Sequence, residues 1–140
     1  MDLNIIKGAD AIGMFCRLHM NTKRNLPIRP SEMGVLIFTQ KQSTAVTPLM
    51  ISQFFKITKP SVTALVTSLV KDGYLTKELS DADKRSYALR ITEKGNDLVD
   101  STFVEYYKSI EILKDNMGEE KFAKFIELVE LAGSIWDEVE

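Results

Sequence analysis

The sequence predicts a mainly α-helical fold that carries one small β-hairpin, an α+β arrangement. Three observations predict it. Residues 58–73 show the apolar periodicity of an amphipathic helix. Two strand-like segments follow on either side of a polar tip, and in the second of them Tyr87, Leu89 and Ile91 alternate with Ala88 and Arg90. The rest of the chain repeats apolar residues mostly at helical intervals. A length of 140 residues suits a single domain with a real core.

The helix over residues 58–73 has one apolar stripe at the spacing i, i+3, i+4, i+7, i+8, formed by Val62, Leu65, Val66, Leu69 and Val70. We expect Thr58 to cap its start, Pro60 to occupy its first turn and Gly73 to end it. Small hydroxyls and lysines occupy the predicted solvent side, namely Lys59, Ser61, Thr63, Ala64, Thr67, Ser68 and Lys71. Such side chains could meet base edges and phosphates.

The hairpin is predicted from residues 74–79 and 87–91, with residues 80–85 as its tip. The tip carries Lys84 and Arg85 at the end of two strands. A helix suited to a major groove, next to a hairpin with a basic tip suited to a minor groove, is the plan of a winged helix. The alternative is an amphipathic helix and a hairpin in any other α+β domain.

Two segments resemble the MarR family of bacterial transcriptional regulators. Residues 83–95, DKRSYALRITEKG, resemble the family's wing signature, and residues 69–75, LVKDGYL, resemble its junction between recognition helix and wing. The resemblance implies a winged helix-turn-helix lobe at residues 31–92. It also implies dimerisation helices at residues 1–21 and 93–140, all within a single domain of residues 1–140.

Before the winged helix, residues 3–21 read as a helix with a broad apolar side, and residues 26–30 as an extended connector. Ser31 is the expected cap of a second helix, and residues 40–46 are an expected loop. Thr47, followed by proline, opens a short third helix that would brace the next one. The family's usual glycine-bearing turn is absent at residues 55–58.

After the wing, Thr92 is expected to cap a long helix that runs to about Lys114. Asn116 and Gly118 should break it before a last helix. The first and last helices carry more apolar surface than one small molecule needs to cover, which indicates a homodimer interface. The alternative is that this surface packs over the chain's own core.

Composition excludes several classes of protein. The single cysteine allows no internal disulfide, and no apolar run approaches the roughly 20 residues of a membrane span. We therefore expect a cytoplasmic protein without a signal peptide. The net charge is −2, but residues 95–140 carry twelve acidic and four basic side chains, while residues 1–94 carry fourteen basic and eight acidic. The acidic side chains are thus concentrated in the C-terminal third, away from the expected DNA-reading segments.

Candidate DNA contacts follow from the residue types. Lys59, Ser61, Thr63 and Thr67 suit base edges, and Thr47 and Ser61 also suit phosphates at helix starts. Lys77 and Lys84 are expected phosphate contacts. By resemblance, Arg85 enters the minor groove and Asp83 supports the wing, while Glu78 replaces a residue that is often basic.

Cys16 is a redox candidate, because peroxide-sensing relatives carry a reactive cysteine in the first helix. A buried and inert thiol is the alternative, since no tyrosine lies between residues 16 and 74. One cysteine and one histidine do not make a structural zinc site, and we expect no cofactor. Phosphate-binding glycine loops and catalytic residue sets are also lacking, so an enzyme is not expected.

The predicted function is a sequence-specific DNA-binding transcriptional regulator. A dimer would place two recognition helices about one DNA turn apart, so its target should be a short inverted repeat. The resemblance implies a repressor that is relieved by a small aromatic effector or an oxidant. Two alternatives remain open, namely a winged-helix module that binds proteins and a ligand-binding dimer without DNA binding.

Overall fold

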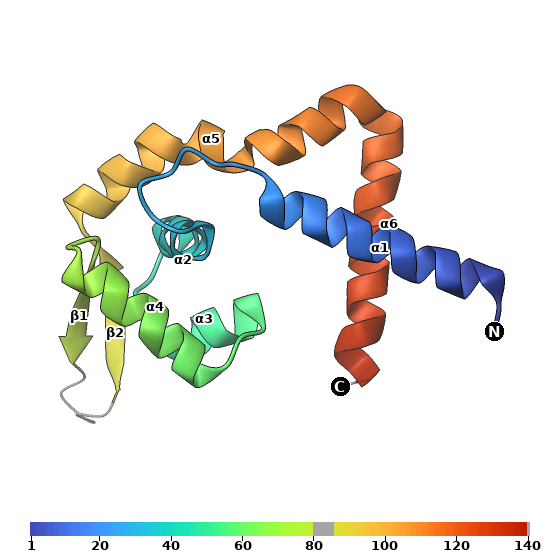
Figure 1. Ribbon diagram of the computed structural model, residues 1–140. Helices are drawn as coiled ribbons and strands as arrows, with labels where there is room; N and C mark the ends of the chain where they lie inside the picture. Colours follow the sequence, from blue (N-terminus) through green and yellow to red (C-terminus); the bar gives the residue numbers. More distant parts are fainter. Residues whose placement is uncertain (80–85, 140) are drawn as a thin grey trace. The chain divides into compact units, whose positions relative to one another are not determined.

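The computed structural model describes residues 1–79 and 86–139 (Figure 1). Within them the chain forms a mainly α-helical fold with a two-stranded antiparallel hairpin, as predicted. The elements are α1 (Leu3–Asn21), α2 (Pro30–Lys41), α3 (Pro48–Phe55), α4 (Lys59–Lys71), β1 (Leu75–Leu79), β2 (Tyr87–Ile91), α5 (Glu93–Met117) and α6 (Glu119–Val139). None of the helices in the described ranges is long and apolar enough to cross a membrane.

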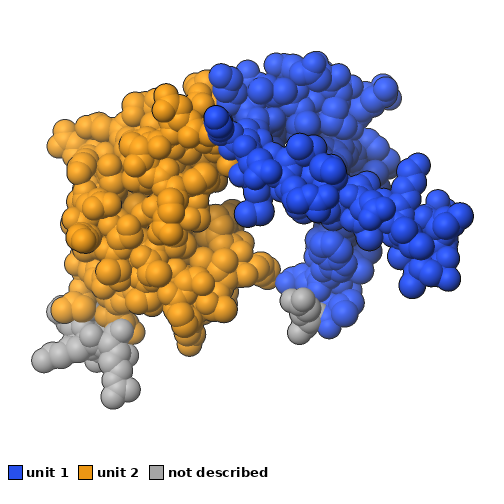
Figure 2. Space-filling model, in the orientation of Figure 1, with its two compact units in different colours: residues 1–23, 107–140 blue, residues 24–106 orange. Residues whose placement is uncertain are grey.

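The chain divides into two compact units, which Figure 2 colours separately. One unit comprises residues 24–106 and holds α2, α3, α4, the hairpin and the first part of α5. The other comprises residues 1–23 and 107–140, which include α1, the rest of α5, and α6. We refer to them as the winged unit and the helical unit.

The core of the winged unit is built around α2. Residues 32–37 of this helix are all buried, so α2 is covered on several sides and is not amphipathic. The largest fully buried side chains include Met33 and Leu36 of α2 itself, together with Ile51, Val62, Val66, Leu69, Leu75, Leu89 and Val99 from α3, α4, the hairpin and α5. The predicted apolar stripe of α4 therefore does face this core.

The hairpin pairs Leu75 with Ile91 and Leu79 with Tyr87 in antiparallel register. Val46 adds a short bridge to it, because its amide donates to the Leu89 carbonyl (3.1 Å) and its carbonyl accepts the Leu89 amide (2.7 Å). Val46 is completely buried. Residues 40–46 were expected to be a loop, so this bridge is a departure from the prediction; a single paired residue leaves no alternation that a sequence pattern could reveal.

Two predicted helix boundaries are wrong. Ser31 does not cap α2, which begins two residues earlier than predicted, with Pro30 in its first position and Arg29 at the N-cap. The Arg29 amide instead donates to the carboxylate of Glu32 (3.2 Å). The end of α5 was predicted at about Lys114, but the helix continues through Asn116. The side-chain amide of Asn116 donates to the Ile112 carbonyl (2.8 Å). Gly118, with φ of 88°, marks the break before α6.

The helical unit carries much exposed apolar surface as a single chain. No residue of α1 or α6 is buried. Phe15 of α1 and Phe125 of α6 meet edge to face, with ring centroids 5.7 Å apart. Large hydrophobic side chains that remain exposed on these two helices include Leu3, Ile5, Ile12, Leu18, Leu131, Ile135, Trp136 and Val139.

Candidate nucleic-acid interface

The turn between α3 and α4 is closed without glycine. Lys56 takes the left-handed conformation there, with φ of 55° and ψ of 47°. Ser52 stabilises the turn twice, since its carbonyl accepts the Ile57 amide (3.2 Å) and its hydroxyl donates to the Ile57 carbonyl (2.7 Å). The helix-turn-helix connection expected at residues 55–58 is therefore present, and a lysine occupies the position that favours glycine.

Threonines cap both helices of this pair, as predicted. The Thr47 hydroxyl accepts the Met50 amide (3.2 Å) at the start of α3. The Thr58 hydroxyl accepts the Ser61 amide (3.3 Å) at the start of α4 and donates to the Ser61 hydroxyl (3.0 Å). Each cap satisfies one of the amide groups that a helix start leaves unpaired.

The outer face of α4 is polar and exposed. Lys59, Thr63 and Thr67 follow one another at four-residue spacing, and all three are exposed, as Ser61 is. The Thr63 hydroxyl donates to the Lys59 carbonyl (3.1 Å), which fixes its orientation and leaves oxygen lone pairs directed outward. Four predicted base-contacting residues are thus brought together on one helix.

Ser68 does not belong to this face, although the sequence placed it there. Its side chain is partly buried, and its hydroxyl donates to Glu32 of α2 (2.7 Å). Burial of the Glu32 carboxylate raises its pKa, but hydrogen bonds from Arg29 and Ser68 together with the Arg29 charge outweigh burial and hold the pKa below its usual value. This buried network was not predicted, and its only sequence signal is an acidic residue within an apolar run.

The junction between α4 and the wing is held by Thr92. Its hydroxyl donates to the carbonyl of Gly73 (2.6 Å) and accepts the amide of Gly95 (3.0 Å), so it caps α5 as predicted and ties that helix to the end of α4. Lys94 adds a bond from its ammonium to the Asp72 carbonyl (2.7 Å). The hairpin therefore leaves α4 in a defined direction.

Side-chain pairs organise the described part of the wing. The Lys77 ammonium lies 4.6 Å from the ring centroid of Tyr87, where the ring face attracts a cation. Arg90 and Glu78 form an ion pair at 2.7 Å, with both side chains about half exposed. Arg90 had been noted only as part of the wing signature, so its pairing with Glu78 was missed.

The remaining candidate residues belong to the helical unit or lie outside the described residues. Asp83, Lys84 and Arg85 belong to residues 80–85, outside the described residues. Cys16 lies in the helical unit and is exposed in the single chain, which contradicts the buried alternative for its thiol there. Among residues 1–79 and 86–139, no group of three or more His, Cys, Asp or Glu side chains could hold a metal ion.

Comparisons with known proteins give consistent matches. Residues 26–86 match the model of the MarR family. The HTH-type transcriptional repressor YetL of Bacillus subtilis is 21% identical over 111 residues, which cover 79% of this chain and 66% of YetL, slightly less than two thirds of that protein. The transcriptional regulator Tm0710 of Thermotoga maritima is 28% identical, with a TM-score of 0.51 and coverage of 79% of this chain and 78% of that one.

A further solved structure matches over nearly the whole chain. Streptococcus pneumoniae FabT, in a structure that contains DNA, is 20% identical and has a TM-score of 0.68, with coverage of 99% of this chain and 100% of FabT. At this identity the match shows a shared fold.

Proposed function

We propose that this chain is a sequence-specific DNA-binding transcriptional regulator of the MarR family, whose model matches residues 26–86. The observation that carries the proposal is the exposed face of α4. This face presents an ammonium and three hydroxyls, while the opposite side of the helix is anchored in the core. A helix with one exposed polar face and one buried apolar face can lie in a major groove without disturbing its own packing.

The proposed contacts fall into three groups. Base edges are contacted by Lys59, Ser61, Thr63 and Thr67 of α4. Phosphates are contacted by Thr47, Ser61, Lys77 and Lys84, and Arg85 enters the minor groove with Asp83 supporting the wing. The hydrogen bonds that Thr47, Ser61 and Thr63 already make fix these side chains before DNA arrives, which reduces the entropy cost of binding.

We further propose that two copies form a homodimer through α1 and α6. Neither helix buries any residue in the single chain, and Trp136 remains 65% exposed. Contiguous apolar surface of this kind marks an interface. A two-fold dimer would present two α4 helices to a short inverted repeat.

The regulation we propose is repression in the cytoplasm that is relieved by a small aromatic effector or by oxidation of Cys16. The similarity to the repressor YetL supports repression, and Cys16 of α1 is exposed in the single chain, where an oxidant can reach it. Oxidation should lower DNA affinity in the wild type and leave Cys16→Ser unaffected. Equal loss in both proteins would remove Cys16 from the proposal. No enzymatic activity is assigned.

A protein-interaction module is the second candidate. It is favoured by two large apolar side chains on α3 of the winged unit, because Leu49 is 57% and Phe54 is 64% exposed. Winged helices can bind proteins with such surfaces, and fold alone does not decide between the two functions.

Titration of a fluorescent duplex from the region upstream of the protein's own gene tests the proposal. Selective binding that weakens steeply with salt is expected, with a slope of about −0.9 per phosphate contact. Arg85→Ala should weaken it. Lack of selectivity at low salt, for this duplex and for a random-sequence pool, would reject the DNA-binding function and favour the second candidate.

A further inference from the structure

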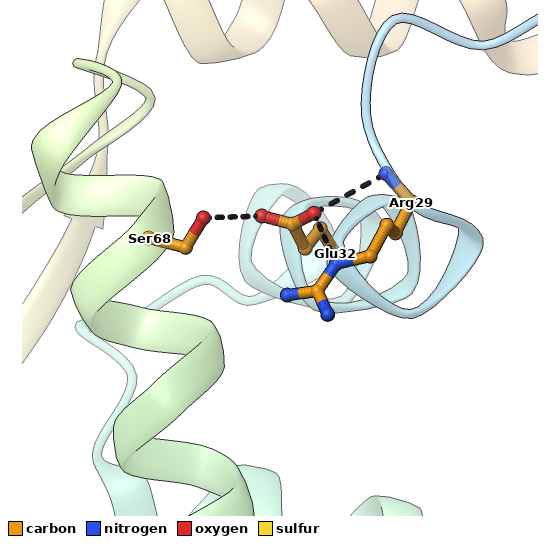
Figure 3. A network of polar contacts seen from close by, with 3 residues as sticks. All are labelled: Arg29, Glu32 and Ser68. Carbon is orange, nitrogen blue, oxygen red and sulfur yellow. Dashed lines mark hydrogen bonds and ion pairs between the residues drawn. The ribbon is translucent and has the colours of Figure 1, made fainter.

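Glu32 joins the start of α2 to the third turn of α4 through one buried carboxylate. Its Oε2 accepts the Ser68 hydroxyl at 2.7 Å, while Oε1 accepts both the amide (3.2 Å) and Nε (2.9 Å) of Arg29. Figure 3 shows the carboxylate between the two partners, with α4 on one side and the first residues of α2 on the other. Glu32 is only 4% exposed.

A carboxylate in this place is costly for stability alone. Burying a charge requires partners for both oxygens, and an apolar side chain of similar size would pack in the same space without that requirement. Apolar contacts, however, allow a helix to slide or rotate slightly. The charge-assisted hydrogen bond from Ser68, to a carboxylate that Arg29 holds in place, fixes direction as well as distance. The network therefore constrains the orientation of α4 in a way that the surrounding core does not.

The constraint bears directly on the polar face of α4. Ser68 follows Thr67 in the chain, and Thr63 lies one turn before Thr67 on the same face. Because a helix turns as a rigid body, holding Ser68 inward determines where Thr63 and Thr67 point. Recognition groups of this kind must be held to within about 0.5 Å of their productive positions.

We propose that Glu32 is a positioning residue for sequence readout, which acts through Ser68 to set the rotation of α4. This inference rests on the proposed DNA-binding function and deepens it. Glu32 touches no base in this scheme. It therefore governs the ratio of operator affinity to random-sequence affinity, while the phosphate contacts that dominate random-sequence binding stay in place.

Paired variants separate this role from packing. Glu32→Met keeps the length of the side chain and removes all three hydrogen bonds, whereas Glu32→Gln keeps an acceptor for Arg29 and an amide for the Ser68 hydroxyl. Ser68→Ala removes the α4 anchor, and Ser68→Thr keeps its hydroxyl. Ser101→Ala, an exposed hydroxyl of α5 bonded within its own helix, and Glu111→Gln, an exposed carboxylate, are the matched controls.

Affinities for the operator and for a random-sequence duplex are measured for each variant after circular dichroism shows that it is folded. We expect Glu32→Met and Ser68→Ala to reduce the operator-to-random ratio by about tenfold, the factor expected for one lost charge-assisted hydrogen bond. Glu32→Gln, Ser68→Thr and the two controls should stay within about threefold of the wild-type ratio. The double variant Glu32→Met/Ser68→Ala should lose no more than either single change, because both remove one interaction.

An unchanged ratio in Ser68→Ala, or strictly additive losses in the double variant, would overturn the inference. Equal weakening on both duplexes would also overturn it, since that is the result of a smaller folded fraction. If Glu32→Met does not fold, the comparison of Ser68→Ala with Ser68→Thr decides alone. A wild-type protein that fails to discriminate between the duplexes would instead refute the proposed function.

Discussion

Gly95 approaches Tyr74 so closely that a Cβ on Gly95 would overlap the Tyr74 carbonyl oxygen. The same Cβ would lie 2.7 Å from Cγ1 of Ile91, so the first turn of α5 lies directly against the junction between α4 and the wing. The Tyr74 carbonyl is also held by the amide of Thr92 (3.1 Å) and cannot simply withdraw. The glycine that ends the wing signature is therefore required by close packing.

Gly95→Ala is expected to lower the free energy of unfolding by about 1–3 kcal/mol, the usual cost of overpacking a tight site. Chemical denaturation of the purified protein measures it. Gly133→Ala in α6 is the control, since a Cβ there meets nothing within 4 Å and alanine favours a helix interior. Equal stability of Gly95→Ala and wild type would show that the junction relaxes without cost.

Lys56→Gly is expected to stabilise the turn between α3 and α4. Lys56 has φ of 55°, a conformation that costs a residue with a Cβ about 1 kcal/mol and glycine very little. Comparison with Lys56→Ala separates this effect from loss of the lysine side chain, because alanine retains the strained backbone. The thermal midpoint should be higher for Lys56→Gly than for Lys56→Ala, and the reverse order would mean that Lys56 is not strained.

Lowering the pH should reduce the free energy of unfolding, because it protonates Glu32. Its pKa is lowered in the folded state, so its contribution to the free energy of unfolding is complete above the ordinary glutamate value of 4.5. This contribution is lost as the pH falls from that value through the lowered folded-state pKa. Denaturation curves between pH 7 and pH 3 should show a smaller acid loss for Glu32→Gln than for wild type. Parallel curves would indicate that Glu32 has no net coupling to folding.

Local patterns in the sequence were sufficient for most of the winged unit. The stripe that includes Val62 and Val66, the caps at Thr47 and Thr58 and the two hairpin strands each depend on neighbours within a few positions, and all are present in the structure. Cap positions were predicted less well where proline competes. At Pro30 the ring, with its fixed φ, starts the helix before the hydroxyl of Ser31 can act as the cap.

The missed features are contacts between residues far apart in the chain. Ser68 bonds Glu32 across 36 positions, and Val46 pairs with Leu89 across the winged unit. Neither contact leaves a periodic signal, because a single hydroxyl or a single paired residue has no repeat. Helical spacing placed Ser68 on the solvent side of α4, and only the identity of the residue that it meets, Glu32, shows that its hydroxyl turns inward.

Substitution of two exposed residues, Lys77 and Thr67, should distinguish phosphate contacts from base contacts. Lys77→Ala is expected to weaken binding to operator and random DNA by the same factor and to reduce the magnitude of the salt slope by about 0.9, because it removes one phosphate neutralisation. Its ammonium already lies over the Tyr87 ring, so it is held near the wing surface. Fluorescence anisotropy at four or more salt concentrations measures both quantities.

Thr67→Ala should behave in the opposite way, since Thr67 is uncharged and lies on the exposed face of α4. The salt slope should stay as in wild type, while operator affinity falls by about 1 kcal/mol and the preference at one base pair in each half-site relaxes. Lys121→Ala on α6, an exposed lysine of the helical unit, controls for the loss of one positive charge. A reduced slope in Thr67→Ala, or an unchanged one in Lys77→Ala, would contradict the assignment of α4 to bases and the wing to phosphates.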